Sequence, residues 1–292
     1  MNTPRPYQKI ALFLLGLAVV FGASVALGSA FEPAAKEEDG TEETMDTHAM
    51  EETSHGSAEY EPAGLGVADG GYSLQMSPSQ LERGQGRELR FTIEADGQPV
   101  TGFDELHERR MHLIVVRRDG TGFRHLHPEM DAAGTWTVPV EFGAAGVYRA
   151  FADFSAGGEQ RTLAADLFVS GGEFEARPFP APQPLAETGG YEVRLDAEEP
   201  VAGESSELSF SVSRDGRPVE GLAPYLGAKG HLVALREGDL AFLHVHPEEG
   251  HEVAAEEIEF AATFPTPGRY RLYLQFDHEG TVHTAEFTVV AR

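Results

Sequence analysis

Two matching stretches decide the fold: HLIVVRRDGTGFRHLHP, from His112 to Pro128, and HLVALREGDLAFLHVHP, from His231 to Pro247. In each stretch, alternating apolar residues flank a short turn, Asp119-Gly120 in the first and Gly238-Asp239 in the second. A two-residue turn of this composition is a strong signal for a β-hairpin. We therefore expect one histidine-bearing hairpin in each stretch.

The two stretches belong to a longer repeat with an offset of 119 residues. Gly71-Tyr72 returns as Gly190-Tyr191, and Asp96-Gly97 returns as Asp215-Gly216. A period of this length is domain-sized and far exceeds the roughly 20–50 residues of a solenoid unit. The sequence therefore predicts a duplicated domain.

The fold class follows from short apolar runs separated by turn residues. This pattern predicts an all-β protein with two tandem immunoglobulin-like antiparallel β-sandwiches, at residues 71–170 and 190–292, joined by a proline-rich linker at 171–189. Strands of the first domain are expected at 89–94, 111–118, 121–127, 135–142, 147–154 and 162–169. Those of the second are expected at 191–195, 207–213, 231–236, 240–246, 257–264, 270–276 and 282–290.

The N-terminal region predicts the compartment. Arg5 and Lys9 precede an uncharged apolar run at residues 10–30, which is long enough to cross a hydrocarbon core of about 30 Å. We expect residues 1–31 to be a signal anchor that spans the cell membrane once, with the domains on the extracytoplasmic side, and residues 32–70 to be a disordered acidic tether. The alternative is a secreted protein, because Gly28-Ser29-Ala30 also resembles a signal-peptide cleavage site.

The composition excludes several kinds of site. The chain has no cysteine, so no disulfide can hold the domains, and no thiolate can form a blue-copper or cysteine zinc site. The formal net charge of −26 argues against nucleic acid as a partner, because phosphates attract Lys and Arg. An acidic surface also attracts cations.

The hairpin register converts the histidine spacing into geometry. A two-residue turn at Asp119-Gly120 places His112 opposite His127, and the equivalent turn in the second repeat places His231 opposite His246. Opposed residues share a face of the sheet with their Cβ atoms roughly 4.5–5.5 Å apart, and a residue two positions along the strand shares that face. The spacing therefore predicts two clusters of three imidazoles: His112, His125 and His127 in the first domain, and His231, His244 and His246 in the second.

The predicted clusters suit a transition metal. The same face carries Ile114 and Val116, so we expect it to point toward the sandwich core and to keep the imidazoles neutral through partial burial. Three neutral histidines suit Cu(II) or Zn(II). Water, Glu129, Glu248 or Met111 could supply a fourth ligand. The competing interpretation is that these histidines only pack and hydrogen-bond at the rim of each sandwich.

The extended blocks HERRMHLIVVRRDGTGFRHLHPEM and PYLGAKGHLVALREGDLAFLHVHPEE resemble those of exported bacterial proteins, frequent in actinobacteria, that carry YtkA-like or copper-resistance-like sandwich domains. The resemblance implies an extracytoplasmic β-sandwich with a link to copper or other heavy metals. It places the positions of interest at the six histidines of the two hairpins. Copper-resistance sandwiches that bind through a processed N-terminal histidine differ from this chain, because neither domain begins with histidine.

Three functional hypotheses follow from the sequence. The leading one is a membrane-tethered metal-binding protein that buffers, delivers or senses copper, or alternatively zinc, with one three-histidine site per repeat. The second is a non-catalytic immunoglobulin-like module that contacts another envelope protein and whose histidines are structural. The third is a metal-dependent hydrolase, which we do not favour because no GxSxG, HExxH or Walker motif is present and no cysteine can serve as a nucleophile.

Overall fold

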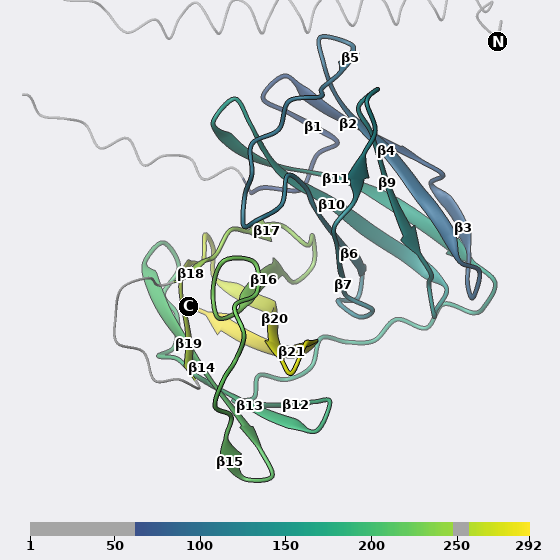
Figure 1. Cartoon of the computed structure of the whole chain (residues 1–292). Coiled ribbons are helices and arrows are strands. Elements are labelled where there is room, and N and C mark those ends of the chain that lie inside the picture. The colour runs from purple at the N-terminus through teal and green to yellow at the C-terminus, as the bar shows by residue number, and fades with distance from the viewer. Residues whose placement is uncertain (1–61, 248–256) are drawn as a thin grey trace, which may run out of the picture. The chain divides into compact units, whose positions relative to one another are not determined.

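The structure is a computed structural model that describes residues 62–247 and 257–292 (Figure 1). The predicted membrane segment and residues 32–61 of the predicted tether lie outside these residues, as do Glu248 and His251. Residues 68–69 of the predicted tether and residues 185–188 of the predicted linker form strands, so the strands of both repeats begin earlier than the predicted boundaries at residues 71 and 190. Within the described ranges, no helix is long and apolar enough to cross a membrane. These ranges fold as strands, turns and loops, and the all-β prediction is confirmed.

The first repeat is a sandwich of two sheets. One sheet has the order β1-β2-β4-β9-β8, with β5 paired to β4, and the other has the order β3-β11-β10-β6-β7. The strands of the first sheet are β1 (Ala68–Asp69), β2 (Tyr72–Ser77), β4 (Arg87–Ala95), β5 (Gln98–Pro99), β8 (Glu129–Met130) and β9 (Thr135–Val140). Those of the second are β3 (Gln80–Glu82), β6 (His112–Arg117), β7 (Arg124–Leu126), β10 (Gly146–Ala156) and β11 (Glu159–Ser170).

The second repeat has the same arrangement, except that its described residues include no counterpart of β3. One sheet has the order β12-β13-β14-β19-β18, with β15 paired to β14, and the other has the order β17-β16-β20-β21. The strands of the first sheet are β12 (Leu185–Thr188), β13 (Tyr191–Asp196), β14 (Ser205–Arg214), β15 (Arg217–Pro218), β18 (His246–Pro247) and β19 (Glu257–Thr263). Those of the second are β16 (His231–Arg236), β17 (Phe242–Leu243), β20 (Gly268–His278) and β21 (Thr281–Ala291).

This topology is immunoglobulin-like. The orders β2-β4-β9-β8 and β11-β10-β6 correspond to the A-B-E-D and G-F-C sheets of an immunoglobulin sandwich, and β13-β14-β19-β18 with β21-β20-β16 repeat them. Strand β3 pairs with β11 in parallel, whereas the other strand pairs are antiparallel. The prediction of two tandem sandwiches is confirmed.

For the residues that pair between β6 and β7 and between β16 and β17, the hairpin register agrees with the sequence prediction. Ile114 is the partner of His125 on β6 and β7, and Leu235 is the partner of Phe242 on β16 and β17. Strand β7 is shorter than expected, because the Asp119 carboxylate accepts hydrogen bonds from the backbone and hydroxyl of Thr121, and Gly122 then adopts a left-handed φ of 67°. Backbone pairing between β6 and β7 therefore starts farther from the turn than the sequence predicted.

The histidine-bearing face points away from the core of its own sandwich, which corrects the expectation above. Alternate residues of β6 have different surroundings: Leu113 and Val115 belong to the core of the first repeat, whereas Ile114 and Val116 belong to a separate apolar cluster. That cluster also contains Val233, Leu235, Leu240, Phe242 and Tyr273 from the second repeat, with Phe151, Ala164 and Phe179. Strand β6 is buried along its whole length because each of its faces is covered by a different repeat.

The described residues, 62–247 and 257–292, belong to one compact unit, and polar contacts reinforce the shared cluster. The Tyr273 ring stacks on Phe123 with centroids 4.2 Å apart, and its hydroxyl donates a hydrogen bond of 2.6 Å to the Gly120 carbonyl. Fully burying a large apolar side chain contributes about 1.5–3 kcal/mol. The facing G-F-C sheets of the two repeats are therefore held together by a second, shared core.

Candidate metal centre

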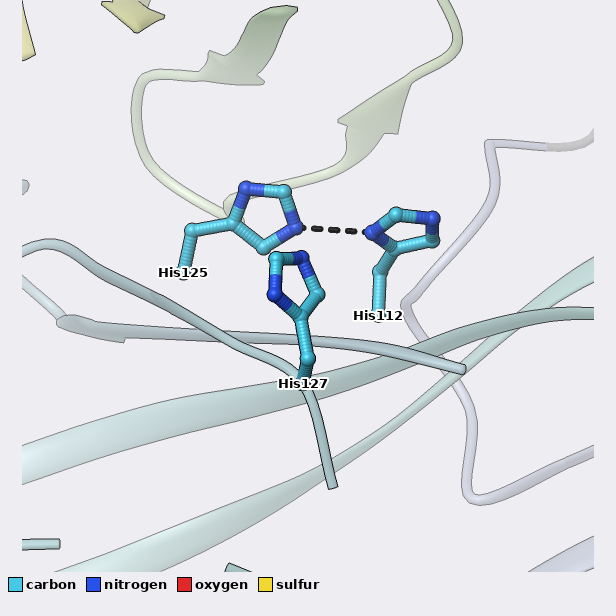
Figure 2. A group of neighbouring side chains, drawn as sticks. All are labelled: His112, His125 and His127. Atoms are coloured by element: carbon cyan, nitrogen blue, oxygen red, sulfur yellow. Dashed lines mark hydrogen bonds between the residues drawn. The ribbon is translucent and has the colours of Figure 1, made fainter. Parts of the chain in front are cut away.

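Three histidines of the first repeat meet at one point (Figure 2). His112 begins β6, His125 lies on β7, and His127 follows β7 directly before Pro128. One ring nitrogen from each lies within 4.8 Å of those of the other two. The hairpin register and the period-two alternation place all three on one face, as the sequence predicted.

Hydrogen bonds determine which nitrogens of His112 and His125 face the centre. The Nε2 atom of His112 lies 2.8 Å from the Leu106 carbonyl, which can only accept, so this nitrogen carries the proton and donates it. Its Nδ1 atom therefore has a lone pair, and it lies 2.8 Å from Nε2 of His125. The other nitrogen of His125, Nδ1, lies 2.7 Å from the side-chain oxygen of Gln275 on β20. A histidine ligand usually donates its second N–H to such a carbonyl oxygen.

His127 supplies the clearest sign of a missing ligand. Its Nε2 atom is buried and has no hydrogen-bond partner among the described residues. Leaving a buried polar atom unpaired costs about 1–3 kcal/mol, so such atoms are uncommon in native structures. A metal ion between the three rings would satisfy this nitrogen.

The second repeat covers the centre. The His231 ring lies 4.7 Å from that of His125 and stacks on His112 at 5.7 Å with an interplanar angle of 11°. His107 lies 5.7 Å from His231, so a fourth and a fifth imidazole border the group. The structure thus brings His231, which the spacing assigned to a second site, next to the first one.

The other residues predicted for the second cluster lie differently. The Nε2 atom of His244 lies 3.2 Å from the Asp153 carboxylate and 2.9 Å from the Thr162 hydroxyl, both in the first repeat. His246 belongs to β18, which pairs with β19 in the other sheet of the second repeat, so the expected position of His246 opposite His231 is wrong. The side chain of His246 is not described. A separate site in the second repeat therefore stays a prediction.

The residues that the sequence suggested as a fourth metal ligand lie in different surroundings. Met111 is 1% exposed and packs in the core of the first repeat, away from the histidine face, whereas Glu129 is exposed. Glu248 lies outside the described residues. His231, whose ring lies against those of His112 and His125, is the neighbouring imidazole that could complete the set, and water is the alternative.

The environment keeps these imidazoles neutral. Burial lowers the pKa of His127 to about 4 and that of His231 to about 3, with the nearby His112 adding to both effects. Burial is also the main cause of the lowered pKa of His112 and of the strongly lowered pKa of His125. Neutral imidazoles have the free lone pairs that a metal requires.

A buried carboxylate lies beside the neutral histidines. Asp153 is 6% exposed, and it pairs with His112 across β10 and β6, so the two side chains share a face. Burial works to raise the pKa of Asp153, but the hydrogen bond from His244 and the proximity of His244 and His112 outweigh it, and the pKa lies below its ordinary value. The centre therefore combines neutral ligands with a nearby negative charge, which favours a cation.

The spacing of the rings is close to that of a metal site. Nitrogen ligands about 2.0–2.1 Å from a tetrahedral ion lie roughly 3.3 Å apart, so the nitrogens of His112 and His125 would separate by about 0.5 Å on binding. Side-chain rotation of this size is small. The three side chains therefore fit a three-histidine metal site whose fourth ligand is water or a neighbouring residue.

The sequence did not identify Asp153, Gln275 or the position of His231 as parts of this centre. The available signal was the unbroken run of apolar residues from Leu113 to Val116, because a strand buried on both faces loses its polar alternation. That run indicates a second covering layer. It does not indicate which segment provides it.

Fold and centre together define the class: a tandem immunoglobulin-like β-sandwich protein with a histidine cluster where its two repeats meet. The chain belongs to the family described as a domain of unknown function (DUF8832), whose model matches residues 66–171 and 186–292. No curated protein matches the chain.

Several solved bacterial structures match this chain at low sequence identity. The Escherichia coli adhesin FdeC is 14% identical over 77% of this chain and 65% of its own, with a TM-score of 0.27. InvD of Yersinia pseudotuberculosis is 13% identical over 77% of this chain and 58% of its own, with a TM-score of 0.26. Invasin, a bacterial integrin-binding protein, is 10% identical over 78% of this chain and 41% of its own, with a TM-score of 0.25. The chain thus spans less than two thirds of the length of each of these structures.

Proposed function

We propose that this protein binds one transition metal ion through His112, His125 and His127. The observation that supports this most directly is the buried, unpartnered Nε2 atom of His127, at the point where the other two rings converge. Four other buried side-chain nitrogens of the described residues also lack a hydrogen-bond partner, but each is an N–H donor of Trp or Arg, whereas Nε2 of His127 can present a lone pair to a metal. A bound ion pairs all three histidines at once.

Copper is the favoured metal and zinc the alternative. Three imidazoles suit either ion, and divalent affinities generally rise to a maximum at Cu(II). Cu(I) suits this centre less, because the chain has no cysteine and Met111, which lies next to His112 in the sequence, packs in the core of the first repeat. The sequence resemblance to YtkA-like and copper-resistance-like domains also supports copper.

The role we propose is non-catalytic: buffering, delivery or sensing of the ion on the outer side of the cell membrane. The apolar run at residues 10–30, preceded by Arg5 and Lys9, supports a membrane anchor, and a cleaved signal peptide is the alternative. The formal net charge of −26 would raise the local concentration of cations. No partner other than the ion is required, although an envelope protein could receive it.

Metal titration of the chelator-treated full chain tests the proposal. Cu(II) and Zn(II) are added separately, and bound metal per chain is measured with a competing chelator. We expect one tight equivalent that the His127→Ala substitution removes. His283→Ala serves as a matched control, because His283 packs on Tyr191 outside the centre and should leave binding unchanged.

The same titration separates the alternatives. A second tight equivalent, lost in His244→Ala, would support the predicted site of the second repeat. If wild type binds neither metal tightly, the histidines are structural, and the hypothesis of a non-catalytic interaction module replaces metal binding.

A further inference from the structure

Gln275 joins the metal centre from the opposite repeat. It lies on β20, is 6% exposed, and has His231 as its cross-strand partner on β16. Its side-chain oxygen lies 2.7 Å from Nδ1 of His125, and its amide nitrogen lies 3.4 Å from the Thr284 hydroxyl, which receives a hydrogen bond from it. The oxygen and the nitrogen of the Gln275 side-chain amide therefore each have a hydrogen-bond partner.

A matching arrangement occurs on the other side of the junction. Asp153 occupies the position on β10 that Gln275 occupies on β20, since each pairs with the first histidine of its own hairpin strand. Asp153 accepts a hydrogen bond from His244, just as Gln275 faces His125. Each repeat thus holds a hairpin histidine of the other, once with a carboxylate and once with an amide.

We propose that Gln275 is a positioning residue that directs Nε2 of His125 toward the metal; this inference rests on the proposed function. A neutral imidazole carries one proton, and a proton on Nδ1 donated to the Gln275 oxygen leaves the Nε2 lone pair free. His112 already presents its own lone pair at Nδ1, because its Nε2 donates to Leu106. Two lone pairs 2.8 Å apart repel each other unless a cation lies between them.

An amide suits both states of the centre, whereas a carboxylate suits only one. Without metal, His125 can hold its proton on Nε2 and donate it to His112, and the reversed amide of Gln275 then donates its N–H to Nδ1. With metal, the proton resides on Nδ1, and the amide oxygen accepts it. The proton moves between two nitrogens of one ring, so His125 neither gains nor loses charge. Through Gln275, the second repeat thereby controls whether His125 presents a lone pair to the metal in the first repeat.

Three variants of the full chain test the role of Gln275. Gln275→Leu removes the acceptor and should weaken Cu(II) or Zn(II) binding by about 10–100-fold, the usual cost of losing such a partner. Gln275→Glu keeps an acceptor and should bind at least as tightly as wild type. Tyr273→Phe is the matched control: it removes a contact between the repeats from the same strand without touching His125, and it should leave the dissociation constant unchanged.

A second readout reports the tautomer directly. Nitrogen-15 NMR of the zinc-loaded wild type should show the His125 proton on Nδ1. An unchanged affinity in Gln275→Leu, or an equal loss of affinity in Tyr273→Phe, would overturn the inference while leaving metal binding intact. Failure of the wild type to bind any metal would instead refute the proposed function.

Discussion

The contact between Tyr273 and Gly120 offers a direct test of how the two repeats are held together. Tyr273 is fully buried, and its hydroxyl donates to the Gly120 carbonyl over 2.6 Å. Tyr273→Phe keeps the ring stacked on Phe123 but leaves the carbonyl of the buried Gly120 unpaired. Leaving a buried acceptor unsatisfied costs about 1–3 kcal/mol.

The expected change in melting temperature follows from this cost. For a folded unit of 150–250 residues, 1 kcal/mol corresponds to about 2–4 °C, so Tyr273→Phe should lower the melting temperature by roughly 2–12 °C. Differential scanning calorimetry of the metal-free protein measures it. Wild type should unfold in one transition, because the repeats share a buried cluster. A melting temperature equal to that of wild type would refute the assignment of this contact as part of a shared core.

Three further predictions concern the centre and the hairpin turn. Cu(II) at 100 times its dissociation constant should stabilise wild type by about 2.7 kcal/mol and should not stabilise His127→Ala; equal stabilisation of both proteins would contradict the site. Because the pKa values of His127 and His231 in the folded state, about 4 and about 3, lie below the ordinary 6.5, the unfolded chain binds more protons in acid. The stability that these two neutral histidines contribute is therefore complete above about pH 6.5 and is lost as the pH falls toward 3–4. A melting temperature that does not fall between pH 7.5 and pH 4.5 would argue against buried neutral rings. Gly120→Ala should lower the free energy of unfolding more than Gly84→Ala. Both glycines have φ near 70°, but of the two only a Cβ at Gly120 would meet another side chain, the Phe179 ring at 3.0 Å. Equal losses of unfolding free energy in urea denaturation would show that backbone strain alone decides the cost.

The sequence was sufficient for the first hairpin and for the duplication, although it did not predict that His246 would join the other sheet of its repeat. The alternation of apolar residues and the turn Asp119-Gly120 predict the hairpin, and the register carries His112, His125 and His127 to one face. The repeat offset predicts the duplication, which the two matches to the family model confirm. These features succeed because strand geometry repeats every two residues, whatever the surroundings.

The sequence did not predict what covers the strand face that carries the histidines. Residues such as Ile114 and Val233 are equally suited to the core of a sandwich and to a contact between sandwiches, because burial requires only apolar surface. The expected direction of the histidine face was therefore wrong, although the grouping of the first three histidines was correct.

Gln275 and Asp153 show the same limit in the polar part of the centre. Asp153 lies 91 residues from His244, which it contacts across the junction, and 41 residues from His112, its partner on the neighbouring strand. Gln275 lies 150 residues from His125. Local periodicity contains no information at such separations. The chain thus determined by itself which histidines share a strand face, because that is a matter of backbone geometry over a few residues. Only the tertiary structure decided what covers them, which nitrogen each presents and where the counter-charge lies, because these depend on the packing of one repeat against the other.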